Sequence, residues 1–207
     1  MTSTPDLAVR PLHLLTGEEP SGVDLQAAES AAHDLLVALG ADLSAESVAG
    51  TPARMARMYA ELLTPSPFTP TTFPNDGGYD ELVVARDIPF HSLCEHHLLP
   101  FMGVAHVAYL PGERLVGLSK LARLVESVAR ALQVQERLTT QIADWLQREL
   151  APKGVGVVLE AEHLCMSLRG VQTAGARTVT SALRGVVRDD PRTRQEFLAL
   201  TQRSSHA

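Results

Sequence analysis

Two short segments of the chain combine cysteine and histidine at spacings that are typical of metal sites. Cys94 and His97 lie three residues apart, so a tight turn would bring a thiol and an imidazole to one ion. His163 and Cys165 lie two residues apart in a segment that alternates as a strand, so both side chains are expected on one face. Sulfur and nitrogen ligands in this mixture favour zinc over magnesium or calcium.

The same residues fit two kinds of zinc site. Two cysteines and two histidines are enough for a closed structural site, and the spacing alone leaves this interpretation open. The two segments together offer three imidazoles, and the surplus one favours a catalytic site. Five candidate ligands exceed the four places around zinc, and hydrolytic sites use a free imidazole for proton transfer.

The elements that position these segments follow from hydrophobic spacing and from chain breakers. Helices are predicted over residues 23–39, from Thr51 as the N-cap, from Ser119 as the N-cap, over 134–150 and over 191–203. Strands are predicted over residues 82–90, 104–110, 154–166 and 178–187, and residues 64–78 are predicted to be loop. This order predicts an α+β fold, an antiparallel sheet with helices on one face.

Basic residues near a helix start suggest an anion site. Gly117 to Lys120 precede a predicted helix that continues through Arg123, and free N–H groups at such a start bind phosphate. Surface cations at capped helices are nevertheless common without a ligand. Glu136, at the start of the next helix, fits either the helix dipole or the adjacent N–H donors of a guanine base.

Composition excludes several classes of function. The 207 residues carry a net charge of −6, which gives no overall field for nucleic acid, and two cysteines are too few for a disulfide-stapled scaffold. No apolar run is long enough to cross a bilayer, so no membrane partner is expected. Residues 1–20 lack the pattern of a secretory signal, and a cytoplasmic location is expected.

Four motifs resemble, in order, those of the GTP cyclohydrolase I family. They are CEHHLLPF at 94–101, GLSKLAR at 117–123, QVQERLT at 133–139 and HLCM at 163–166. TPARMA at 51–56 and TRQEFL at 193–198 are also similar, so the resemblance covers about residues 28–201. Ala131 and Leu168 depart from residues that are common in the family.

The resemblance implies a tunnelling fold (T-fold), in which the antiparallel sheets of several subunits join into a barrel backed by helices. It also implies an N-terminal helical extension and a homodecamer of two pentamers with active sites shared between subunits. The expected organisation is a disordered tail over residues 1–22, a helical region and loop over 23–80, and the catalytic domain over 81–207.

Residue by residue, the resemblance implies zinc (Zn2+) on Cys94, His97 and Cys165. His96 and His163 would then be free imidazoles for acid–base catalysis, with Ser119 assisting at the opened ribose. The implied substrate contacts are Gln135, Glu136, Lys120, Arg123, Arg169, Arg54 and Arg57.

The implied reaction converts GTP to 7,8-dihydroneopterin 3′-triphosphate and formate, the first step of tetrahydrofolate and pterin biosynthesis. A 7-cyano-7-deazaguanine reductase, a rival of the same fold family, needs a free nucleophilic cysteine, whereas both cysteines here belong to the zinc pattern. A non-catalytic, zinc-stabilised nucleotide-binding paralogue is the other alternative. The intact His96 and His163 argue against it.

Overall fold

The computed structural model describes residues 22–202, so the predicted disordered tail lies outside the described residues except for Gly22. The described helices are α1 (Leu25–Ala38), α2 (Glu46–Ala49), α3 (Thr51–Leu63), α4 (Leu118–Ala129), α5 (Gln135–Leu150), α6 (Leu164–Ser167), α7 (Val186–Asp189) and α8 (Pro191–Thr201). The described strands are β1 (Thr72–Pro74), β2 (Val83–Cys94), β3 (Pro100–Leu110), β4 (Arg114–Val116), β5 (Leu132–Gln133), β6 (Gly154–His163) and β7 (Thr178–Gly185). None of these helices is long and apolar enough to cross a membrane.

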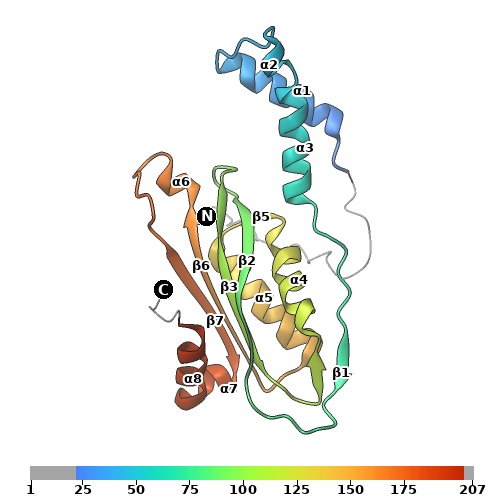
Figure 1. Cartoon of the computed structure of the whole chain (residues 1–207), viewed down its shortest axis with the longest axis vertical. Coiled ribbons are helices and arrows are strands. Elements are labelled where there is room, and N and C mark those ends of the chain that lie inside the picture. The colour runs from blue at the N-terminus through green and yellow to red at the C-terminus, as the bar shows by residue number, and fades with distance from the viewer. Residues whose placement is uncertain (1–21, 203–207) are drawn as a thin grey trace, which may run out of the picture.

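A five-stranded sheet in the order β5-β2-β3-β6-β7 organises the fold (Figure 1). The pairs β2–β3, β3–β6 and β6–β7 are antiparallel, as predicted, and the short β5 adds to β2 in parallel. A second sheet joins β1 to β4. The loop predicted over residues 64–78 therefore contains a strand, because the Thr72–Pro74 backbone finds hydrogen-bonding partners in β4.

The main core lies between the sheet and the helices α4 and α5. Alternate residues of β3 and β6, such as Val107 and Leu159, enter this core with Leu124 and Ile142 from the helices. The residues between them face the other side, where α7 and α8 cover one end of the sheet. The prediction of helices on one face is therefore correct for α4 and α5 only.

A β-bulge in β2 keeps both halves of this strand on the main core. The register with β3 shifts between Ala85 and Ile88, and Asp87 adopts a positive φ of 53°. Before the bulge, Val83 and Ala85 contact the core. After the bulge, Ile88 and alternate residues that follow it face the core. The extra residue changes the parity of the strand, so that Cys94 also points to the face covered by α4 and α5.

The helices α1 and α3 pack on each other beyond one end of the sheet (Figure 1). Asp24 caps α1, so the helix begins two residues later than predicted. Gly40 follows its C-terminal end with a φ of 85°, at the predicted stop. Thr51 is not an N-cap, since Gly50 occupies that position and the Thr51 hydroxyl accepts a hydrogen bond from Arg54 instead.

The caps of the later helices also differ in part from the prediction. Gly117 is the N-cap of α4, and Ser119 is its second helical residue and makes no capping hydrogen bond. The closing helix α8 begins at Pro191, as predicted, because Asp190 accepts the N–H of Thr193 at 2.8 Å.

The docking of α8 gives a first prediction. Phe197 is fully buried on β6, where a Cβ at Gly156 would lie 2.8 Å from its ring. Truncation leaves a cavity, so we expect Phe197→Ala to lower the free energy of unfolding by about 3–5 kcal/mol in a urea titration. Leu198→Ala, at a 40% exposed neighbour, should change it by no more than about 0.5 kcal/mol. Equal effects of the two variants would contradict this packing.

Candidate functional site

The turn between β2 and β3 brings His97 back to Cys94. Cys94 is the last residue of β2, and its carbonyl accepts the N–H groups of His97 and Leu98 at 3.2 and 2.8 Å. Leu98 adopts a positive φ of 56°, which reverses the chain into β3. The Nδ1 atom of His97 then lies 3.7 Å from the Cys94 sulfur.

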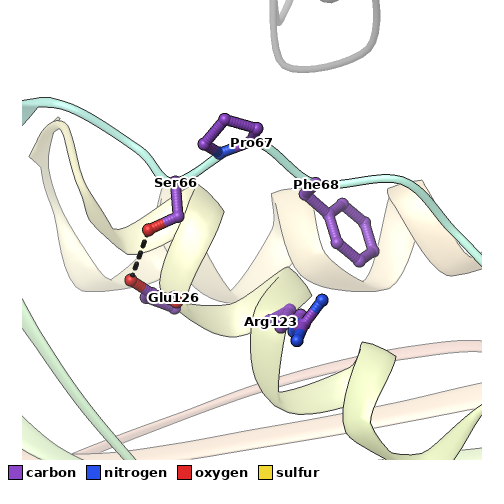
Figure 2. Close-up of a pocket in the computed structure, with 5 residues that line it drawn as sticks. All are labelled: Ser66, Pro67, Phe68, Arg123 and Glu126. Carbon is purple, nitrogen blue, oxygen red and sulfur yellow. Dashed lines mark hydrogen bonds between the residues drawn. The ribbon is translucent and has the colours of Figure 1, made fainter.

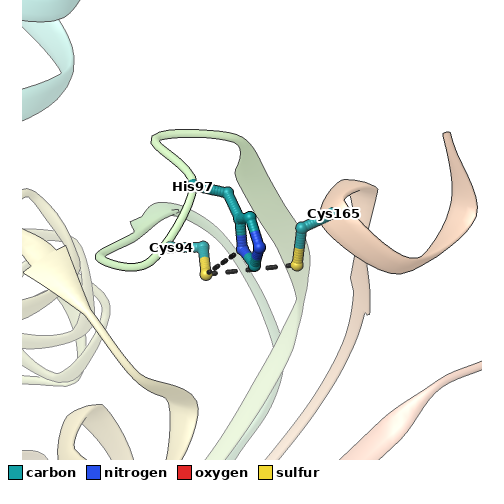
Figure 3. Close-up of side chains that lie close together, drawn as sticks. All are labelled: Cys94, His97 and Cys165. Carbon is teal, nitrogen blue, oxygen red and sulfur yellow. Dashed lines mark hydrogen bonds between the residues drawn. The ribbon is translucent and has the colours of Figure 1, made fainter. Parts of the chain in front are cut away.

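Cys165 comes to the same place from a different element than predicted. The strand β6 ends at His163, and Cys165 lies in the short helix α6, so the two residues do not share a strand face. The Sγ atoms of Cys94 and Cys165 are 4.0 Å apart. Figure 3 shows these sulfurs and the His97 ring converging from the β2–β3 turn and from α6.

The three side chains fit a tetrahedral metal ion. Their ligand atoms all lie within 4.8 Å of one another. A Zn–S distance of about 2.3 Å places two sulfur ligands of a tetrahedral ion about 3.8 Å apart, close to the observed separation. Cys94 is buried and His97 is exposed, so the cluster opens to solvent on the histidine side. The sulfur and nitrogen donors therefore suit a transition-metal ion, with room for a further ligand.

The ionisation of the two thiols is sensitive to nearby charge. Burial raises the pKa of Cys165, and the neighbouring Cys94 raises it further. A raised pKa favours the neutral thiol, whereas a bound metal cation favours the thiolate, because metal ligation requires the deprotonated sulfur. The guanidinium of Arg169 also lies beside the cluster, with Nη1 3.1 Å from Nε2 of His97.

His163 lies next to the cluster and is fixed by two contacts. Its ring stacks on Phe101, its register partner in β3, with the centroids 4.7 Å apart and the planes at 2°. Its Nε2 atom lies 2.7 Å from Oε1 of Gln135 at the start of α5. Burial lowers the pKa of His163 below its ordinary value, and the nearby Glu136 opposes this effect. Burial therefore favours the neutral form of this imidazole.

Gln135 is committed to protein partners. Its side chain is 1% exposed, and its Nε2 atom donates to acceptors in β6 and β7, namely the carbonyls of Leu159 and Thr178 and the hydroxyl of Thr180. The amide orientation is thus determined by packing, which leaves Oε1 for His163. The predicted contact of Gln135 with a substrate remains a prediction, whereas the adjacent Glu136 is exposed and available for one.

His96 lies on the solvent side of the turn. Its Nδ1 atom is 3.9 Å from the Cys94 sulfur, and its side chain is 64% exposed. Its Nε2 atom lies 3.8 Å from a carboxylate oxygen of Glu95. His96 is therefore beside the cluster and accessible.

The structure does not bring the predicted phosphate residues of α4 to this cluster. The N–H of Val116, just before Gly117, donates to the Tyr109 hydroxyl, whereas the cluster adjoins the Phe101 end of the same strand, β3. Eight residues at about 3.3 Å each separate Tyr109 from Phe101 by about 26 Å. Ser119 and Lys120 therefore lie toward the opposite end of the sheet.

Arg123 faces a separate shallow cavity of about 220 Å³ (Figure 2). This cavity lies between α4 and residues 66–68, where the Ser66 hydroxyl donates to Glu126 at 3.2 Å. Arg54 and Arg57 are exposed on α3, and Arg54 donates to the Ser47 carbonyl and the Thr51 hydroxyl. No contact of the described residues joins these arginines to the cysteines.

Sequence reasoning missed two contributors to the site. Phe101 belongs to a recognised motif, but its role beneath His163 depends on the β3–β6 register, which no local pattern reveals. The ion pair between Glu95 and Arg137 joins two motifs that lie 42 residues apart. Opposite charges in two of the motifs, at Glu95 and Arg137, were the available signal, and it is a weak one.

A family profile and individual relatives agree on one family over most of the chain. The GTP cyclohydrolase I family profile matches residues 28–202. The GTP cyclohydrolase 1 of Aquifex aeolicus (strain VF5) is 52% identical over 180 residues, covering 87% of this chain and 98% of that protein. That of Streptomyces avermitilis is 52% identical over 194 residues, covering 90% and 95%. That of Lysinibacillus sphaericus is 48% identical over 190 residues, covering 89% and 100%.

Metal binding provides the second prediction. Removing either sulfur leaves two protein ligands, so Cys94→Ala and Cys165→Ala should each lose bound zinc, measured by elemental analysis after dialysis. Ser167→Ala, in the same short helix as Cys165, is the matched control and should keep one zinc per chain. Full zinc content in both cysteine variants would exclude the cluster as the metal site.

Proposed function

Because the chain belongs to the GTP cyclohydrolase I family, we propose that it converts GTP to 7,8-dihydroneopterin 3′-triphosphate and formate. This reaction is the first step of pterin and folate biosynthesis. The observation that carries the proposal is the cluster of Cys94, His97 and Cys165 beside an imidazole, His163, whose orientation is fixed. A structural zinc site does not need that imidazole. A cytoplasmic location is part of the same proposal.

We propose zinc as the metal, on the chemistry of the three ligands. When bound, zinc supplies a Lewis acid and lowers the pKa of its water to about 7. The residues around it then have to present C8 of the guanine ring to the open side of the cluster. Glu136 supports this role, since its exposed carboxylate accepts the adjacent N–H donors of a guanine edge.

His163 is the proposed proton carrier, and its contact with Gln135 supports Nδ1 as the atom that exchanges the proton. The amide oxygen of Gln135 only accepts hydrogen bonds, so Nε2 of His163 carries a proton and donates it to this oxygen. Nδ1 therefore has the lone pair that exchanges a proton with the substrate. In this proposal Gln135 positions His163, and the exposed His96 is the second acid–base group.

The triphosphate requires residues that one chain does not bring to its own cluster. Ser119 and Lys120 closely follow Val116, which hydrogen-bonds to Tyr109. About 26 Å of strand separates Tyr109 from the Phe101 end, which is too far for one nucleotide to contact both ends. A second subunit placing its α4 start at the cluster would complete the site, with Arg123, Arg54 and Arg57 as further candidates for the phosphates and Arg169 already in place. This arrangement supports shared sites in a homo-oligomer, and we propose the decamer of two pentamers.

The edge of the sheet supports the same assembly. Among the described residues β7 pairs only with β6, so its outer backbone groups face away from the sheet. Such an edge accepts a strand from another chain. Sheets joined in this way would close into the barrel of a tunnelling fold.

GTP turnover tests the proposed function. The zinc-loaded protein should release formate and a pterin, fluorescent after oxidation, in equal amounts, and chelation should abolish both products. His163→Ala should retain one zinc per chain but release no formate, because the proton exchange at the guanine ring is lost. Formate release at the wild-type rate by this variant would refute the role of His163, and no product from the zinc-loaded wild type would refute the function.

Subunit mixing tests the shared site. His163→Ala and Lys120→Ala disable opposite halves, so refolding the two inactive variants together should restore about one quarter of the wild-type activity by random assembly. Mixing His163→Ala with Cys165→Ala disables the same half twice and should restore none. Equal recovery from both mixtures would contradict a site built from two subunits.

A further inference from the structure

Arg137 joins the start of α5 to the metal-binding turn. It follows Glu136 directly, and its guanidinium contacts three acceptors. Nε donates to Oε1 of Gln133 at 2.9 Å, and Nη2 donates to the Leu132 carbonyl at 2.7 Å and to Oε2 of Glu95 at 2.5 Å. A planar fork that meets three acceptors has one orientation, which a lysine ammonium does not reproduce.

Gln133 makes the position of this fork rigid. Its side chain is 3% exposed, and its Nε2 atom donates to the Val128 carbonyl at 3.1 Å and to Gln141 at 2.8 Å. Both amide hydrogens are therefore used, and the oxygen is turned toward Arg137. A buried amide that is fully satisfied resists rotation, because any other orientation loses these bonds.

Glu95 connects the fork to the cluster. It directly follows the ligand Cys94, and its own N–H donates to the Gln133 carbonyl at 3.1 Å. Its second carboxylate oxygen lies 3.8 Å from Nε2 of His96. The turn is thus attached to β5 through its backbone and to α5 through the side chain of Glu95.

We propose that the Glu95–Arg137 pair is a positioning device that fixes the metal-binding turn relative to the start of α5. The turn carries His96 and His97, and α5 carries Gln135 and Glu136. The pair therefore sets the distance between the metal ligand and the groups that orient His163 and the base. This role rests on the proposed function, because the relative position of the two elements matters only where one substrate contacts both.

Without such a positioning role, an ion pair at the surface would be expected to change folding stability very little. The side chains of Glu95 and Arg137 are 32% and 41% exposed, and pairs of this exposure contribute little to folding stability. The matched control is the pair of Asp144 with Arg184, which joins α5 to β7 at 2.8 Å with similar exposure. Arg184 pairs in register with Val155, near the end of β6 that is remote from His163.

The test compares Glu95→Gln, Arg137→Gln, the double variant and the control Arg184→Gln. Cobalt(II) replaces zinc as the probe, because its visible spectrum and its affinity report ligand geometry without turnover. Each of the two single variants should weaken cobalt affinity about tenfold and change the spectrum, because a shift of the turn moves the ligands that it carries, an effect of the size seen when support of a metal ligand is lost. The double variant should be no worse than either single one, and Arg184→Gln should match the wild type.

Kinetics provide the second readout. With GTP, the kcat of the two single variants should fall about tenfold while KM changes less than twofold, because the distortion affects alignment more than binding. Additive effects of the two substitutions on cobalt affinity, or an unchanged cobalt spectrum in both, would overturn the proposal. Coupled cobalt effects in a protein that releases no product from GTP would support the positioning device and refute the proposed function instead.

Discussion

The position of Cys94 in the cluster depends on the β-bulge in β2, because the bulge decides which face of the sheet each later side chain of the strand points to. Val83 and Ala85 contact the main core before the bulge, and Ile88 does so after it. The same parity places Cys94 on the face covered by α4 and α5. Hydrophobic packing against these helices stabilises the shifted register, and the ligand position follows from it. One ligand of the site, Cys94, is therefore itself a residue of the main core, at its end.

The buried amide of Gln135 links the core to His163, the proposed acid–base group. An unsatisfied buried amide is costly, so the side chain keeps its partners in β6 and β7 and directs its oxygen to His163. Phe101 supports the other side of the imidazole by stacking. The orientation of the ring is thus a consequence of core packing, and in the proposed function this packing would prepare His163 before a substrate arrives.

Under the proposed function, the length of the sheet is the reason why one chain would not complete the site alone. The strands separate the cysteines from the start of α4, while the charged groups of Arg54 and Arg57 lie on the helix α3 beyond the sheet. A substrate with a base at one end and phosphates at the other requires both kinds of residue within one nucleotide's length. Association of several copies through the β7 edge would meet this requirement without any change of fold.

The sequence by itself determined most elements, because periodicity, caps and breakers are local, and the Cys94–His97 spacing indicated a metal turn. The proposed roles came from the resemblance of whole motifs. Only the tertiary structure decided that Cys165 leaves the strand for α6, that α8 covers the second face, and that Gln135 is buried under His163. These features depend on contacts between residues far apart in the chain. The pairing register, the bulge in β2 and the burial of Gln135 arise from such contacts, which the alternation within one strand does not specify.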